Sequence, residues 1–287
     1  MMPDRRLTPV LALVLAFALI VTLFPVFWVL MTSLKPPTDW NAAPAVWIPS
    51  APTMVNFRTL FDPSALEAYG LSGVSQPATP SILGSLLAAS IATALSIAIG
   101  LASAIGLSRY SVLTKWTPLV ILSGRMFPPA AIAVPFVIMF SAVHLIDSFT
   151  GLIAIYVAVT LPFSTWMLKS FVDDLPVEIE QAAMLDGRSR LMAHLLVTIP
   201  LIRGGVFATT MFIFILNWSE FMFALVLSYT NVTTIPVQLA KYVTATAGTL
   251  YGVQAALAVL AMLPLILVGY AIQGHLARGM TFGAVKR

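Results

Sequence analysis

Two charged side chains stand deep inside apolar stretches of this chain, and they are the first candidates for chemistry. Arg125 lies about eight residues into the apolar run 117–143, and Glu220 lies about sixteen residues into the run 204–228. A charged side chain in hydrocarbon costs at least about 2.5 kcal/mol, so both should face protein or a wet cavity. They indicate a pathway for a polar solute. A structural salt bridge between them is the alternative, although they stand at different depths.

Prolines interrupt the run that contains Arg125. Pro128, Pro129 and Pro135 have no N–H to donate and collide with the carbonyl groups four residues earlier in a helix. Carbonyl groups freed at this depth are tolerated where they line a cavity or meet neighbouring helices. The interpretation is a pathway helix that carries Arg125, Pro128 and Pro129. A proline kink that serves packing alone is the alternative.

Asn217 and Trp218 stand just before Glu220 and have the side-chain types that recognise sugars. An aromatic face packs on the C–H groups of a sugar, while amide and carboxylate groups form hydrogen bonds with its hydroxyl groups. The three residues are therefore candidates for the substrate pathway. A tryptophan at this level can equally be an interfacial anchor or a core residue.

Other groups that could carry out a reaction are scarce in this sequence. The three histidines, His144, His194 and His275, stand in or beside loops, and no paired acids lie within an apolar run, so we expect neither an enzyme nor a metal site. The absence of cysteine excludes disulfides and thiolate metal sites. No GxxxxGK[ST] loop is present to hold a nucleotide, so energy must come from another subunit or from an ion gradient.

The composition predicts an all-α, polytopic membrane protein. Of 287 residues, 59% are hydrophobic and 9% are charged, which is too apolar for the surface of a soluble domain. Six apolar runs are long enough to span a bilayer as helices. Their bounds are about 10–31, 81–107, 117–143, 152–171, 204–228 and 253–273. A signal peptide is the alternative for the first run, but the run exceeds a signal core and no small-residue cleavage site follows it.

Basic residues give the predicted sidedness of these spans. Lysine and arginine gather on the cytoplasmic side of membrane proteins. In the six-span layout the cytoplasmic residues are Arg5, Arg6, Arg109, Lys115, Lys169, Arg188, Arg190, Arg203, Arg278, Lys286 and Arg287. The outer residues are Lys35, Arg58 and Lys241. Both chain ends are therefore predicted to be cytoplasmic, and the net charge of +4 follows the membrane rather than nucleic acid.

The polar segments between the spans fall on the two sides accordingly. The aromatic-rich loop 33–80 is predicted to be extracytoplasmic and to pack on the outer face of the membrane. The polar interval 175–200 and the tail 276–287 are predicted to be cytoplasmic. Within the second span, small side chains recur every fourth residue, which is typical of a helix-contact face in lipid. They are Ala88, Ala92, Ser96, Gly100 and Ala104.

The interval 175–200 reads as two short helices joined by a tight turn. Pro176 suits a first helical position, and Asp186-Gly187 ends the first helix because glycine accepts the left-handed conformation. Ser189 can cap the second helix. A solvated loop between two membrane helices, without a further role, is the alternative interpretation.

This interval resembles the EAA loop in the membrane subunits of ATP-binding-cassette (ABC) importers, which reads Glu-Ala-Ala, three residues, Gly, nine residues, Ile, one residue, Leu, Pro. The spacing is kept throughout, at Gln181, Ala182, Ala183, Gly187, Val197, Ile199 and Pro200. Gln181 departs from the family glutamate, although Glu180 stands beside it. The resemblance implies a coupling helix that sits in a cleft of a separate ATPase subunit. The implied coupling residues are Glu180, Gln181, Ala182, Ala183, Asp186, Gly187 and Pro200.

Further phrases resemble the permease subunits of carbohydrate importers, in the family of binding-protein-dependent inner membrane components. They are SGRMFPPAAIAVPF at 123–136, LIDSFTGLI at 145–153, LPFSTWMLKSF at 161–171, NWSEF at 217–221 and RGMTFGAVKR at 278–287. The closest type is the smaller, six-helix subunit of maltose-type transporters, with a MetI-like fold. Ser219 and the terminal Arg287 depart from the family pattern.

The resemblance implies that residues 1–287 form one transmembrane domain in a prokaryotic inner membrane. The implied partners are a second homologous permease, two ATPase subunits that bind ATP and Mg²⁺, an extracytoplasmic sugar-binding protein, a sugar and membrane lipid, but no nucleic acid. The tail 276–287 would dock into the ATPase pair; attraction of its basic residues to anionic lipid is the alternative. An ion-coupled secondary transporter or a channel remains the rival function, and nothing in the sequence names the sugar.

Overall fold

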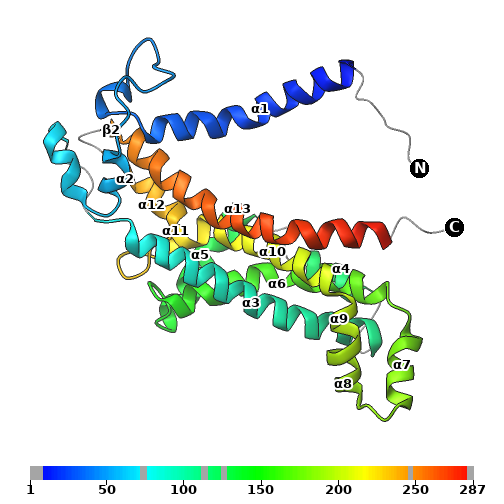
Figure 1. Ribbon diagram of the computed structural model, residues 1–287. Helices are drawn as coiled ribbons and strands as arrows, with labels where there is room; N and C mark the ends of the chain where they lie inside the picture. The colour runs from blue at the N-terminus through cyan, green and yellow to red at the C-terminus, as the bar shows by residue number, and fades with distance from the viewer. Residues whose placement is uncertain (1–8, 72–75, 111–115, 124–127, 245–247, 283–287) are drawn as a thin grey trace. The chain divides into compact units, whose positions relative to one another are not determined.

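The structure is a computed structural model that describes residues 9–71, 76–110, 116–123, 128–244 and 248–282, and within these residues the predicted all-α class is confirmed (Figure 1). The single hairpin of the described residues pairs β1 with β2. The elements are α1 (Pro9–Ser33), η1 (Pro37–Asp39), α2 (Val55–Thr59), η2 (Pro63–Tyr69), α3 (Thr79–Arg109), α4 (Thr117–Ser123), α5 (Pro129–Ala142), α6 (Phe149–Asp173), α7 (Val177–Leu185), α8 (Arg190–Ala193), η4 (His194–Thr198), α9 (Ile199–Leu201), α10 (Arg203–Trp218), α11 (Met222–Leu227), α12 (Ile235–Lys241), β1 (Val243–Thr244), β2 (Gly248–Thr249) and α13 (Tyr251–Phe282).

Several helices are long and apolar enough to cross a membrane. Among the described residues these are α1, α3, α6 and the part of α13 from Tyr251 to Tyr270. A fifth span results if the bent pair 190–201 and 203–218, which meet at 76°, counts as one crossing. The chain is therefore a multi-pass membrane protein. The six-span layout stays a prediction, because the third run holds the shorter helices α4 and α5 on either side of residues outside the described ranges.

The predicted fifth span, 204–228, is not one continuous helix. It consists of α10 and α11, with a break at Ser219–Phe221. The carboxylate of Glu220 accepts hydrogen bonds from the N–H groups of Phe223 (2.9 Å) and Ala224 (3.0 Å). A side chain that satisfies the first free N–H groups in this way starts a new helix, so Glu220 marks the beginning of α11.

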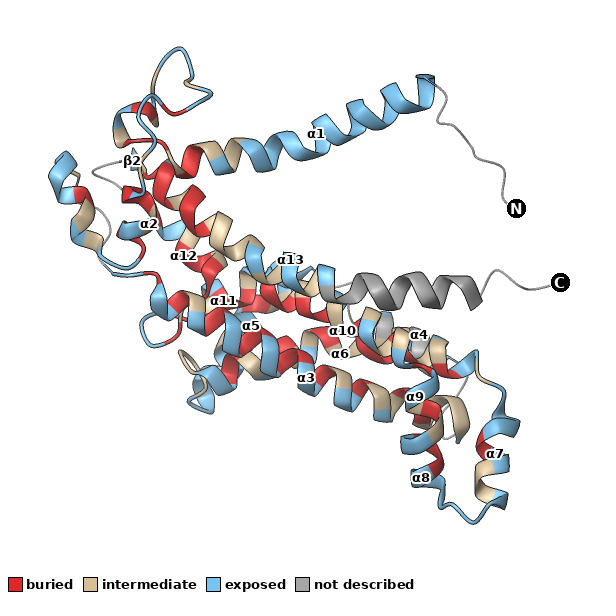
Figure 2. Ribbon diagram, viewed as in Figure 1, coloured by how far each residue is buried: buried red, intermediate tan, exposed pale blue. Residues whose placement is uncertain are grey.

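The chain forms two compact units, of which the first comprises residues 1–79 and 238–262. In this unit α1 is exposed along most of its apolar length and buried at its C-terminal end (Figure 2). The loop that follows is folded, as its aromatic content predicts. The amide of Asn56 donates to the carbonyl groups of Ser33 and Lys35 (2.8 Å each), and Asp39 accepts from the backbone N–H of Ser50 (2.9 Å).

The second unit comprises residues 80–237 and 263–287, and within it α3 packs against α6. The predicted small-residue face of α3 is buried at all five positions, which confirms it as a helix-contact face. The hydroxyl groups of Ser96 and Thr160 are 2.8 Å apart, and Ser164 donates to the carbonyl of Ser96 (2.8 Å). A Cβ atom on Gly100 would overlap the side chain of Ser164, so the two backbones approach closely only because position 100 is glycine.

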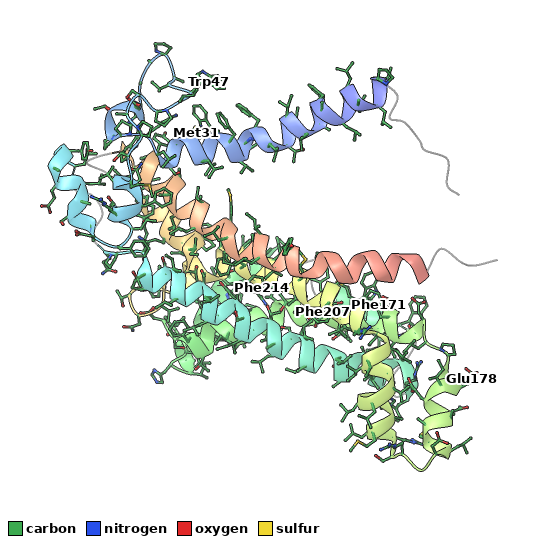
Figure 3. The ribbon with its side chains drawn as sticks, in the orientation of Figure 1. Met31, Trp47, Phe171, Glu178, Phe207 and Phe214 are labelled. Carbon is green, nitrogen blue, oxygen red and sulfur yellow. The ribbon has the colours of Figure 1, made fainter. Side chains whose placement is uncertain are left out.

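Apolar clusters among the described residues hold the second unit together. One surrounds Tyr156 of α6 and Phe223 of α11. Another joins Ala104 of α3, Leu168 of α6 and Ile202. Beside the second cluster, Gly205 of α10 lies against the ring of Phe171, whose place near the interval 175–200 is seen in Figure 3. The ends of α3, α6 and α10 that carry this interval are therefore tightly packed.

Candidate functional site

The interval 175–200 has the predicted helix–turn–helix form. Helices α7 and α8 stand side by side and are joined at Gly187, whose φ is +85° (Figure 1). The N–H of Gly187 donates to the carbonyl of Met184 (3.0 Å), and the N–H of Arg188 donates to that of Ala183 (3.2 Å). These two bonds form a Schellman motif, which requires a left-handed residue at the position of Gly187. Ser189 accepts from the N–H of Met192 (3.3 Å), as predicted.

The second helix of this hairpin changes pitch before it reaches Pro200. Helix α8 covers only one turn and continues as the π-helical turn η4 and then as α9. Pro200 has no N–H for the carbonyl of Leu196, so a regular α-helical ladder cannot continue through this point. Wider π-helical turns of this kind occur often at functional sites.

The tip of the hairpin exposes both polar and apolar side chains. Gln181, Ala182, Asp186, Gly187 and Pro200 are exposed, and Ala183 is half-buried. Leu185 beside the turn has an exposed fraction of 89%. Further exposed apolar residues are Val177, Ile179, Leu191, Met192, Leu195 and Leu196. Exposed apolar side chains concentrated in one short segment are typical of a protein-docking surface.

Glu180 is the exception among the candidate coupling residues, because it is buried, with an exposed fraction of 4%. Its carboxylate accepts from Nε of Arg109 (2.9 and 3.1 Å) and from the hydroxyl of Thr198 (2.9 Å). Nδ1 of His194 lies 3.6 Å from it. Sequence reasoning grouped Glu180 with Gln181, whereas the structure gives them opposite environments. Consecutive residues of a helix point about 100° apart, so neighbours in sequence need not share a face.

Sequence reasoning did not identify Arg109, Thr198 or His194 as partners of Glu180, and Arg109 makes the most contacts of the three. Besides holding Glu180, its Nη2 donates to the carbonyl groups of Val172 (2.9 Å) and Leu175 (3.0 Å) at the end of α6. A guanidinium at a helix C-terminus also interacts favourably with the helix dipole. The position of Arg109 at the end of a predicted span was visible in the sequence. Its partners were not, because they lie more than sixty residues away.

Of the candidate pathway residues in the third apolar run, the structure describes Pro128 and Pro129. Arg125 lies outside the described residues. Pro128 is the N-cap of α5 and Pro129 is its first residue, two positions where a missing N–H costs nothing. These prolines therefore start a helix rather than kink one. Pro135 lies inside α5. The expectation that Pro128 and Pro129 free carbonyl groups within a helix is therefore corrected.

Asn217 and Trp218 are buried, with exposed fractions of 2% and 5%. The amide of Asn217 donates to the hydroxyl of Thr93 (3.1 Å), and Trp218 stacks on Phe214 with ring centroids 5.6 Å apart. Together with the capping role of Glu220, these contacts give all three residues partners within the protein. Their contact with a substrate stays a prediction.

The turn before α6 is fixed to the segment after α11 by one carboxylate. Asp147 has a positive φ of 53° and accepts from the N–H groups of residues 229–232 at 2.8 to 3.2 Å. Burial raises the pKa of this carboxyl, but the hydrogen bonds from Asn231 and its neighbours outweigh burial and hold the pKa well below its usual range. The two segments therefore stay joined at neutral pH.

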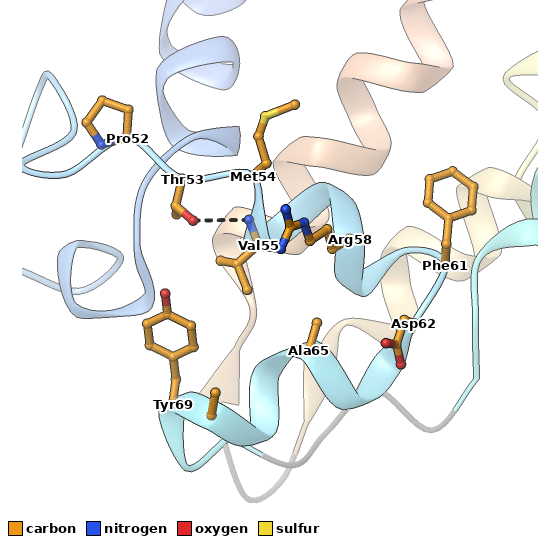
Figure 4. Close-up of a pocket in the computed structure, with 10 residues that line it drawn as sticks. Pro52, Thr53, Met54, Val55, Arg58, Phe61, Asp62, Ala65 and Tyr69 are labelled. Atoms are coloured by element: carbon orange, nitrogen blue, oxygen red, sulfur yellow. Dashed lines mark hydrogen bonds between the residues drawn. The ribbon is translucent and has the colours of Figure 1, made fainter.

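The first unit contains an open groove of about 850 Å³ in the predicted extracytoplasmic loop (Figure 4). Arg58 and Asp62 supply charge to its lining, and Phe61 and Tyr69 supply aromatic rings. On its rim the N–H of Val55 donates to the hydroxyl of Thr53 (3.2 Å). The lining of the groove therefore combines charged and aromatic side chains.

Apolar helices long enough to span a membrane, with an exposed helical hairpin between two of them, define the chain as a multi-pass membrane protein. The profile of the family described as "Binding-protein-dependent transport system inner membrane component" matches residues 96–282. The chain belongs to this family, and it is a permease subunit of a binding-protein-dependent ABC transporter.

Three relatives named as transport permease proteins support this assignment. The chain is 31% identical, over 95% of its length and 92% of the relative, to the probable ABC transporter permease protein y4oR of Sinorhizobium fredii. It is 31% identical to the sulfoquinovosyl glycerol transport system permease protein SmoH of Agrobacterium fabrum, over 92% of this chain and 89% of the relative. It is 28% identical to the trehalose/maltose transport system permease protein MalG of Thermococcus litoralis, over 93% and 92%.

A solved structure shares the fold. The crystal structure of a bacterial ABC transporter involved in the import of the acidic polysaccharide alginate contains a chain that superposes with a TM-score of 0.73 at 19% identity. The superposition covers 92% of this chain and 94% of the other. The predicted fold of an ABC importer permease is therefore confirmed, and the rival interpretation as an ion-coupled transporter or channel is not favoured.

Proposed function

We propose that this permease belongs to an ATP-driven sugar importer and couples to separate ATPase subunits through residues 175–200. The observation that carries the proposal is the hairpin of α7 and α8, which keeps the spacing of the family loop and exposes an apolar tip at Leu185. Support for a sugar substrate comes from relatives whose names specify trehalose/maltose and sulfoquinovosyl glycerol.

The remaining parts of the transporter follow from this proposal. A second homologous permease supplies the other half of the pathway, and two ATPase subunits bind ATP and Mg²⁺ and hydrolyse the nucleotide. Both ends of the chain face the cytoplasm of a prokaryotic cell. The extracytoplasmic sugar-binding protein delivers the sugar on the side of loop 33–80, where the groove around Arg58 and Tyr69 offers contacts.

Reconstitution tests the proposal directly. The chain is co-purified with its partner permease and ATPases, placed in proteoliposomes and supplied with ligand-loaded binding protein. Uptake should require ATP and persist when ion gradients are collapsed. The sugar that co-purifies with the binding protein, or stabilises it thermally, identifies the substrate. Uptake driven by an ion gradient without ATPase subunits would contradict the proposal.

Leu185→Asp should release the ATPase subunits. A charge at this 89% exposed position leaves the fold of the hairpin unchanged but has to be desolvated in an apolar cleft. We expect co-purified ATPase to fall by about tenfold or more, the usual effect of losing a central contact of an interface. Leu185→Met is the matched control and should co-purify with the normal amount of ATPase. Normal ATPase binding by Leu185→Asp would exclude the tip of the hairpin from docking.

Cysteine labelling on α5 tests the predicted pathway helix. Ala130 is exposed, whereas Ala133 is buried with an exposed fraction of 3%, so the two positions separate the faces of the helix. In this naturally cysteine-free chain, Ala130→Cys should react with a water-soluble thiol reagent, and its rate should change when ATP and binding protein drive alternating access. Ala133→Cys and, on the buried face of α3, Ala92→Cys should stay unreactive. Absence of labelling at Ala130→Cys in every nucleotide state would remove α5 from the pathway.

A further inference from the structure

The carboxylate of Glu180 is fully engaged inside the protein. It sits on the buried face of α7, where Arg109 and Thr198 both donate to it at 2.9 Å and His194 lies 3.6 Å away. The exposed fraction of the Arg109 side chain is 10% and that of the Glu180 side chain is 5%. An ion pair at this depth is screened little by solvent, and removing one partner leaves an uncompensated buried charge.

Arg109 connects three elements through one guanidinium group. It is the last residue of α3, its Nε holds Glu180 of α7, and its Nη2 holds the carbonyl groups of Val172 and Leu175 at the end of α6. The planar fork of arginine can point different N–H groups at several acceptors at once, which the single ammonium of lysine cannot reproduce. Thr198 adds a fourth element, η4, to the same carboxylate.

We propose that Glu180 and Arg109 are positioning residues that fix the coupling helix α7 to the ends of α3 and α6, so that a displacement of α7 reaches both spanning helices as one movement. The inference rests on the proposed function of the hairpin as the coupling loop. It assigns Glu180 a role distinct from that of the exposed Gln181, because the carboxylate has no free face to offer an ATPase subunit.

Glu180 is expected to matter for coupling because little else of α7 is buried. The helix is nine residues long, and Glu180 is its buried residue. A short helix with little buried surface can tilt or unfold locally when a partner subunit moves it. The displacement then deforms the loop and does not reach the membrane helices. Coupling between distant sites needs packed side chains or hydrogen-bonded networks with discrete arrangements. The buried pair supplies such a link between α7 and the membrane helices.

The test uses the full transporter with its ATPases and binding protein. Glu180→Gln keeps the size of the side chain and removes its charge. We expect sugar uptake per assembled complex to fall by at least about tenfold, the scale set by breaking a buried ion pair, while the ATPases remain bound. Hydrogen exchange should become faster in residues 177–185 and at the end of α6. Arg109→Lys, which keeps the charge but not the fork, should give an intermediate loss.

Glu178→Gln is the matched control. This acid lies on the same helix two residues earlier and is exposed (Figure 3). It should leave hydrogen exchange unchanged in residues 177–185 and at the end of α6, because it removes a surface charge and leaves the buried pair intact. If Glu180→Gln yields too little complex, Thr198→Val replaces it: this variant keeps the ion pair and removes one donor, so uptake should fall by about threefold with a smaller rise in exchange.

Normal sugar uptake per assembled complex in Glu180→Gln, with unchanged exchange, would overturn the inference. So would loss of the ATPases with unchanged exchange, since that result assigns Glu180 to docking. The positioning role and the proposed function can fail independently of each other. If uptake is ATP-dependent and Leu185→Asp releases the ATPases while Glu180→Gln is silent, the proposed function stands and the positioning role fails. If uptake needs no ATPase at all, the proposed function itself fails.

Discussion

Gly187→Pro should abolish transport while leaving the protein in the membrane and assembled with its partner permease. The φ of +85° at this position is closed to proline, whose ring fixes φ near −65°. Proline also removes the N–H that donates to the carbonyl of Met184. Together these effects cost about 3 kcal/mol or more at the turn, so the orientation of α8 against α7 is lost. Uptake assays on the assembled complex measure the result.

Gly187→Asn is the control for this variant. Asparagine tolerates the left-handed conformation better than other residues with a side chain, and a Cβ at position 187 meets no atom within 4 Å. We expect Gly187→Asn to retain much of the uptake. Near-normal uptake by assembled Gly187→Pro would mean that the turn does not serve coupling.

Gly100→Leu should prevent the second unit from folding. Position 100 lies where α3 crosses α6, and even a Cβ atom would overlap the side chain of Ser164. Overpacking of this kind costs about 3 kcal/mol or more when backbones must separate. The hydrogen bond from Ser164 to the carbonyl of Ser96 would break as well. The measurement is the amount of membrane-inserted, detergent-stable protein.

Gly106→Leu tests whether the effect belongs to the site rather than to the residue type. Gly106 lies on the same helix, and a Cβ there meets no atom within 4 Å. We expect this variant to accumulate normally, with a small gain in helix propensity of about 0.5 to 1 kcal/mol. Equal accumulation of both variants would show that the α3–α6 contact tolerates separation.

Features that depend on neighbouring residues could be predicted from the sequence. Apolar runs predicted α1, α3, α6 and much of α13 to within a few residues of most of their ends, because burial in a bilayer demands long uninterrupted hydrophobicity. The left-handed turn at Gly187 and the cap at Ser189 were readable because both depend on local backbone chemistry. The small-residue face of α3 followed from helical periodicity alone.

Features that depend on residues far apart in the sequence required the three-dimensional structure. Arg109 and Glu180 are 71 residues apart, and Asn217 and Thr93 are 124 residues apart. No local pattern shows which buried polar groups will meet, because that choice is made by how α3, α6 and α10 pack. The same holds for the opposite environments of Glu180 and Gln181. Helical periodicity gives the angle between side chains on one helix, whereas the packing of neighbouring helices determines which side chains face the protein interior.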